Sequence, residues 1–118
     1  MTKDADTTTA TPEPDVITFE GRKFVRFTHT FTDHFLPEEM SEVSISFHFS
    51  KPTEPQIKRL QNTAGRDSSG AARNLLISTV LPDQRDRLKS TLEEYVGLAT
   101  TFSTALIKSV GISADLGN

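Results

Sequence analysis

The stretch ISFHFSKPTEPQIKRL, residues 45–60, decides the fold because its period changes in the middle. Before Lys51 the residues alternate as in a strand, and after Thr53 apolar residues recur at helical spacing. The alternation places Val43, Ile45, Phe47 and Phe49 on one side, and Ser44, Ser46, His48 and Ser50 on the other. We predict one buried face and one wet face, as in an antiparallel sheet covered on one side by helices.

The join itself is interpreted as architecture rather than as a reactive site. Pro52 ends the strand, and Thr53 is expected to cap a helix, with Gln56 three residues later completing a capping box. Pro55 is tolerated in the first helical turn.

Upstream, VITFEGRKFVRFTHTF, residues 16–31, predicts a β-hairpin with Gly21 at the turn. A helical alternative stays open for residues 24–35, because the phenylalanines at 24, 27, 31 and 35 also share one helical face. The β-branched Thr28, Thr30 and Thr32 favour extended chain at least to Phe31. Residues 37–42, PEEMSE, are expected to form an acidic loop or short turn.

Downstream, caps and breakers divide the chain into four short helices. They are expected between Thr53 and Gly65, from Asp67 or Ser68 to Pro82, from Asp83 to Gly97, and from there to Gly111. Their apolar stripes are Ile57, Leu60 and Ala64; Ala72, Leu75, Leu76 and Val80; Leu88, Leu92 and Tyr95/Val96; and Leu98, Phe102, Leu106 and Val110. The last three helices have short connections and are expected to pack as neighbours.

The sequence therefore predicts an α+β domain: a small antiparallel β-sheet, made of the N-terminal hairpin plus one strand, followed by about four short antiparallel helices. Residues 1–15 are expected to form a disordered, acidic and Thr-rich tail. A single domain covers 16–111, with its β part at 16–50 and its helical part at 53–111. Residues 112–118 are expected to be a frayed tail.

Charge and composition disfavour several classes of function. The net charge of the 118 residues is −3, with nine acids and four bases in residues 1–50 and nine bases and seven acids in 51–118. No strongly basic segment results, so nucleic acid is not expected as a partner. The chain has no cysteine, and we find neither a secretory leader nor an apolar run long enough for a membrane. A cytoplasmic protein without membrane contact is expected.

No catalytic residue, metal ligand or cofactor site is predicted, and the protein is not expected to be an enzyme. His29, His34 and His48 match no ligand spacing, and we interpret all three as solvent-facing. The Ser68-Ser69-Gly70 run is interpreted as a helix cap rather than a phosphate loop. Glu93 and Glu94 are adjacent on a charged helix face and point apart.

The phenylalanines carry the clearest functional hint. The chain has eight, seven of them between Phe19 and Phe49. The conflict of periods in residues 24–35 leaves some of them without an obvious interior, and exposed apolar groups of this kind mark protein–protein surfaces. We therefore take Phe24, Phe31 and Phe35 as candidate partner-binding residues.

The second half of the chain resembles the small tail assembly chaperones of tailed phages and prophages. The resemblance is carried, in order, by Lys51-Pro52-Thr53, Arg73-Asn74-Leu75-Leu76, Pro82-Asp83 with Leu88, and Gly97-Leu98-Ala99, and it covers about residues 45–111. It implies a non-enzymatic protein in the bacterial host cytoplasm that binds tape-measure and tail-tube proteins and is able to self-associate. It also suggests Phe102 and Leu106 of the last helix as contact residues.

Two other functions remain as alternatives. A regulatory or nucleic-acid-associated domain would use a basic helical face, drawn from Lys58, Arg59, Arg66, Arg73, Arg85 and Arg87. A small metal-dependent enzyme or sensor would depend on His29 or His48.

Overall fold

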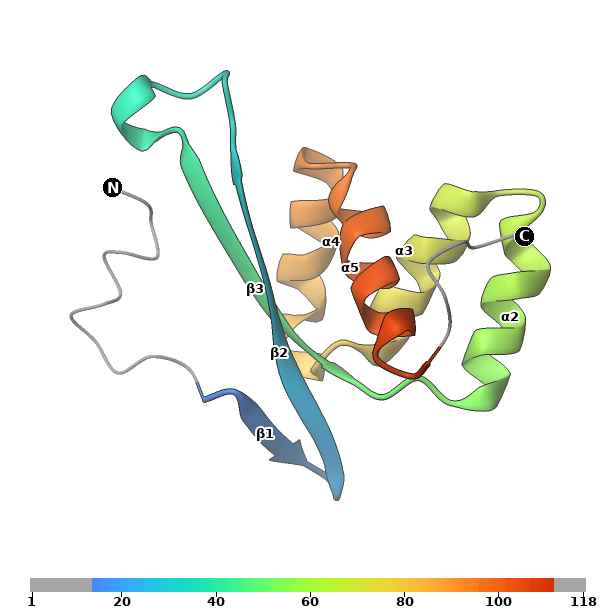
Figure 1. Ribbon diagram of the computed structural model, residues 1–118. Helices are drawn as coiled ribbons and strands as arrows, with labels where there is room; N and C mark the ends of the chain where they lie inside the picture. The colour runs from blue at the N-terminus through green and yellow to red at the C-terminus, as the bar shows by residue number, and fades with distance from the viewer. Residues whose placement is uncertain (1–13, 112–118) are drawn as a thin grey trace.

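The computed structural model describes residues 14–111 and confirms the α+β architecture, with a three-stranded antiparallel sheet followed by helices (Figure 1). The elements are β1 (Val16–Phe19), β2 (Arg22–Thr32), η1 (Glu38–Met40), β3 (Glu42–Ser50), α2 (Glu54–Ala64), α3 (Ser68–Thr79), η2 (Pro82–Gln84), α4 (Arg85–Glu94) and α5 (Leu98–Lys108). None of the helices described is long and apolar enough to cross a membrane.

The sheet is a meander in the order β1-β2-β3, in which each strand pairs with the next along the chain. Glu20 and Gly21 form the first turn with φ of 51° and 76°, the positive values that two-residue hairpin turns require. The open question over residues 24–35 is settled as strand as far as Thr32. The acidic stretch after it contains the short 3-10 helix η1.

The core lies between the sheet and the helices, which cover one of its faces (Figure 1). At its centre, Phe102 of α5 packs edge-on against Phe47 and at a tilt against Phe49, with ring centroids 6.1 and 5.8 Å apart. The buried residues around these rings come from β3 and all four helices and include Leu60, Leu76, Leu88, Leu106 and Ile107. The predicted helical stripes thus supply most of the core.

The join between β3 and α2 has the predicted capping box. The Thr53 hydroxyl accepts a hydrogen bond from the Gln56 backbone N–H, and the Gln56 side-chain oxygen accepts one from the Thr53 N–H, at 3.4 and 2.9 Å. The Gln56 amide nitrogen also donates to the carbonyl and hydroxyl oxygens of Ser78, both at 3.4 Å. One glutamine therefore starts α2 and ties it to the end of α3.

The link between α3 and α4 lies along the outer edge of β3. Val80 forms a bridge with Phe49, and the Leu81 N–H donates to the His48 carbonyl at 2.8 Å. The third helix does not begin at Asp83 as predicted, because Asp83 lies inside η2 and α4 begins at Arg85 without a side-chain cap. Gln84, the residue before α4, is buried and faces β3.

The prediction that one face of β3 is exposed to solvent is wrong at the C-terminal end of the strand. His48 and Ser50 are buried, with 0% and 1% of their surface exposed, and Phe24, which pairs with Ser50, is buried beside them. The α3–α4 link covers this end, since Ser50 donates to the Thr79 carbonyl and Gln84 contacts His48. The alternation of apolar and polar residues along a strand cannot predict that a distant segment covers its polar side.

The two expected tails lie mostly outside the described residues. Pro14 and Asp15, which were included in the N-terminal tail, are described and make contacts with the sheet. The Asp15 carboxylate pairs with Arg26 at 2.6 Å, and the Asp15 carbonyl accepts from the Arg26 N–H at 2.8 Å.

Candidate protein-binding surface

The loop between β2 and β3 carries three exposed apolar side chains, among them Phe35, the most exposed large apolar side chain of the described residues. Phe35 is 99% exposed, Met40 54% and Leu36 37%. We call these three residues the tip patch. The β2–β3 hairpin extends beyond the helices, so that its tip stands apart from the domain (Figure 1). An apolar group presented in this way is typical of protein-binding surfaces.

Backbone and side-chain hydrogen bonds hold the tip loop in one shape. The Asp33 carboxylate accepts from the Phe35 N–H at 2.9 Å, and the Asp33 N–H closes the hairpin on the Ser41 carbonyl at 2.8 Å. The Met40 N–H donates to the Pro37 carbonyl at 2.8 Å, which forms the turn of η1. A loop ordered in advance loses less entropy when it binds.

One hydrogen bond connects the tip to the helices. The Tyr95 hydroxyl, at the end of α4, donates to the second Asp33 oxygen at 2.7 Å. This bond, followed by the Phe35 N–H, holds the pKa of Asp33 below its usual value. The same bond to Asp33 is the main reason that the pKa of Tyr95 is raised to about 12. Asp33 is thus an ionised acceptor that serves Phe35 and Tyr95 together.

The partner-binding residues expected from the sequence divide between the surface and the interior. Phe35 is exposed, and Phe31 is half-buried with its ring 5.0 Å from that of Tyr95. Phe24, Phe102 and Leu106 are 5%, 1% and 1% exposed, so their burial removes them from any surface. Phe102 and Leu106 lie on the face of α5 that packs into the core, where the Phe102 ring contacts Phe47 and Phe49 of β3.

Sequence reasoning missed Leu36, Met40 and Val96. Val96 follows Tyr95 in the turn between α4 and α5 and is 77% exposed, although it was assigned to an inward stripe. Helix α4 ends at Glu94, so Val96 no longer follows its helical face. A signal for Leu36 and Met40 was present, since both are apolar residues in a stretch that follows neither strand nor helix period.

The charge around the tip is acidic. Residues 33–42 contain four carboxylates and residues 93–97 contain two, and neither segment has a lysine or arginine. They are Asp33, Glu38, Glu39, Glu42, Glu93 and Glu94. The tip patch and Val96 therefore lie in segments that carry carboxylates and no lysine or arginine.

The histidines do not form a metal site in the part of the chain described. No group of three or more histidine, aspartate or glutamate side chains there could hold a metal ion. The expectation of three solvent-facing histidines is wrong for His48: Gln84 bonds to its ring Nδ1 at 3.1 Å and to its backbone N–H at 2.8 Å. Its Nε2 lies 2.8 Å from the Pro14 carbonyl and must donate, because a carbonyl only accepts.

The start of α3 is a capped helix end, as its sequence suggests. The Asp67 carboxylate accepts from the Gly70 N–H at 2.9 Å, and a β-carbon at Gly70 would lie 2.1 Å from the other Asp67 oxygen. Gly70 thus permits the close approach of the cap. The position that a bound phosphate would need is taken by the protein's own carboxylate.

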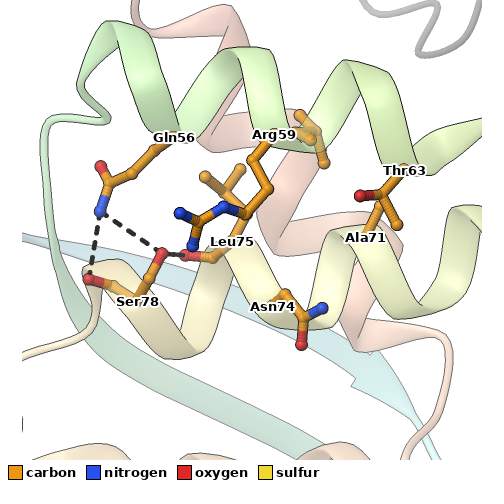
Figure 2. A pocket seen from close by; sticks show the side chains of 8 residues that line it. Gln56, Arg59, Thr63, Ala71, Asn74, Leu75 and Ser78 are labelled. Carbon is orange, nitrogen blue, oxygen red and sulfur yellow. Dashed lines mark hydrogen bonds between the residues drawn. The ribbon is translucent and has the colours of Figure 1, made fainter.

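Two hollows were considered as sites for a small ligand. The first, between α2 and α3, has a volume of about 40 Å³, enough only for a few waters (Figure 2). The second, of about 290 Å³, lies beside the β1–β2 turn and includes Glu20, Arg22 and Arg85 in its lining. Its one hydroxyl from the sheet, that of Ser50, already donates to the Thr79 carbonyl. The Ser78 hydroxyl, which lines both hollows, donates to the Leu75 carbonyl at 2.9 Å.

Some of the basic residues proposed for nucleic-acid contact already interact with other groups of the protein. The Arg87 guanidinium lies 4.2 Å from the centre of the Phe47 ring and donates to the Ser46 carbonyl at 3.3 Å. Lys58 lies 4.0 Å from Glu54, and Arg59 lines the hollow shown in Figure 2.

The fold defines a small α+β domain built from a β-meander with helices on one face. The chain belongs to the DUF6848 family, described as a domain of unknown function, which matches residues 26–117. A solved structure, of an uncharacterised protein from Bacillus stearothermophilus, is similar to it with 26% sequence identity and a TM-score of 0.58. The similarity covers 75% of this chain and 85% of that one. No curated protein gives a significant match.

Proposed function

We propose that this chain is a non-enzymatic protein-binding module, a tail assembly chaperone or adaptor that engages tape-measure and tail-tube proteins of a phage or prophage. The observation that carries the proposal is Phe35, a large aromatic side chain 99% exposed on a loop held by hydrogen bonds at both ends. Exposed aromatic anchors on ordered loops are typical of protein interfaces.

The motifs behind the resemblance support this class of protein. Three of the four lie where one element leads to the next: Lys51-Pro52-Thr53 between β3 and α2, Pro82-Asp83 in η2, and Gly97-Leu98-Ala99 at the start of α5. The fourth, Arg73-Asn74-Leu75-Leu76, lies within α3. The proposal places the protein in the cytoplasm of a bacterial host cell, without a cofactor. It also allows self-association of the chain.

Co-purification tests the proposal directly. The tagged chain is co-expressed with the tail-tube and tape-measure proteins encoded nearest to its gene. The molar mass of the purified material is then measured by light scattering. We expect a stable complex with at least one of them. A genome without tail genes near this one, or tail proteins that elute separately, would count against the tail function.

A further inference from the structure

The tip patch is apolar and the segments around it are acidic. We infer that it binds a basic amphipathic helix, whose apolar side covers Phe35, Leu36 and Met40 and whose lysines or arginines face the surrounding carboxylates. This inference rests on the proposed protein-binding function and adds the kind of partner that the surface accepts.

The apolar part of the contact is the tip patch on the hairpin loop, and a second exposed apolar side chain, Val96, lies at the turn after α4. The Tyr95–Asp33 hydrogen bond, 2.7 Å long, joins the two segments and fixes the tip relative to the turn. An amphipathic helix presents apolar residues every three or four positions and is suited to cover a small apolar patch of this kind. Met40 is flexible and adapts to irregular apolar neighbours.

The charge selects among possible occupants. Six carboxylates lie in the two segments, without a lysine or arginine between them. A second copy docked tip to tip would bring twelve carboxylates together, and like charges oppose such a contact. A partner with lysines or arginines beside its apolar stripe gains attraction at the same place. The binding should therefore weaken as salt screens the charges.

The test uses two synthetic helical peptides of about four turns. One is built of leucine and lysine, and the other of leucine and glutamate with the same apolar stripe. Binding is followed by the fluorescence of Tyr95, which is the chain's single tyrosine in a sequence without tryptophan. We expect the leucine–lysine peptide to bind and to bind several-fold more weakly when salt rises from about 50 to about 500 mM. The leucine–glutamate peptide is expected not to bind.

Variants locate the contact. Phe35→Ala should weaken peptide binding at least about tenfold, as truncation of an aromatic anchor does. Its matched control is Phe19→Ala, which removes a partly exposed phenylalanine at the β1–β2 turn and should leave binding unchanged. The double variant E38Q/E42Q keeps the tip patch and should flatten the salt dependence.

Several results would overturn the inference. They are equal binding of both peptides, equal loss with Phe19→Ala and Phe35→Ala, no binding of the leucine–lysine peptide, or a dimer of the free chain that Phe35→Ala dissociates. If tail proteins still co-purify in any of these cases, the proposed function stands and only the partner chemistry is wrong. If the peptide binds through Phe35 and no tail protein does, the inference stands and the tail assignment fails.

Discussion

Tyr95 gives direct access to the contact that holds the tip. Its hydroxyl donates to Asp33, and its ring packs edge-on against Phe31 on the hairpin, with centroids 5.0 Å apart. No other tyrosine or tryptophan contributes to the near-ultraviolet signal. A single phenol therefore reports whether hairpin and helices are connected.

We predict that Tyr95 titrates near pH 12 in the folded protein, because its pKa is raised to about 12, mainly by the hydrogen bond to Asp33. Absorbance of the tyrosinate near 295 nm measures this, and the same chain in urea should titrate at about 10. A pKa raised on folding contributes stability that is complete below about pH 10 and is lost as the pH approaches 12.

Two variants separate the causes of this shift. Asp33→Asn removes the largest one and should bring the pKa of Tyr95 back toward its ordinary value. Glu94→Gln removes the smallest one, the charge of Glu94, and serves as the control. If both variants titrate like the wild type, the hydrogen bond is absent in solution.

His48 shows what a sequence cannot predict at the scale of one residue. Its position on the polar side of a strand indicated exposure, yet it is fully buried. Its partners are Pro14 and Gln84, 34 and 36 positions away in the chain. Burial of this kind depends on tertiary contacts, which leave no periodic signal near His48. Phe35 is the opposite case, since the conflict of periods around it did indicate an exposed aromatic residue.

Among the elements, those defined by local chemistry were predictable. The capping box of α2, the cap of α3 by Asp67 and the hairpin turn at Gly21 all depend on residues within a few positions of one another. The elements that escaped prediction depend on distant contacts. The end of α3 joins β3 through Val80, and the turn at Val96 leaves the helical stripe. The tip patch was only partly predictable for the same reason.

We predict that Thr53→Ala lowers the free energy of unfolding by about 1 kcal/mol, because it removes the hydroxyl that caps α2. Urea denaturation followed by circular dichroism measures the change. Thr100→Ala, an exposed threonine within α5, is the control and should change stability by less than about 0.5 kcal/mol. Peptide or tail-protein binding should persist in Thr53→Ala; its loss with unchanged stability would show that Thr53 belongs to a contact surface.

At the scale of the whole molecule, the sheet and the helices share one hydrophobic core. Replacing a phenylalanine by alanine should therefore destabilise the fold in the core and have little effect on stability at the tip. Phe102→Ala removes a ring that contacts Phe47 and Phe49, and we expect a loss of about 3–5 kcal/mol. That is a large part of the about 5–15 kcal/mol typical of a domain.

Phe35→Ala is the matched control at this scale, because the side chain is 99% exposed. It should change the unfolding free energy by less than about 0.5 kcal/mol. Urea titrations of both variants make the comparison. A stability loss with Phe35→Ala as large as that with Phe102→Ala would mean that the tip is packed against something in the free protein.

The pairing of Val80 and Leu81 with β3 has a consequence for behaviour at high concentration. The outer edge of a sheet offers free N–H and C=O groups that template strand addition by another chain. Here the link from α3 occupies that edge beside Phe49 and His48, at the most deeply buried end of the strand. The link thus covers the edge of β3 at its most buried end and protects this edge from β-aggregation with other chains.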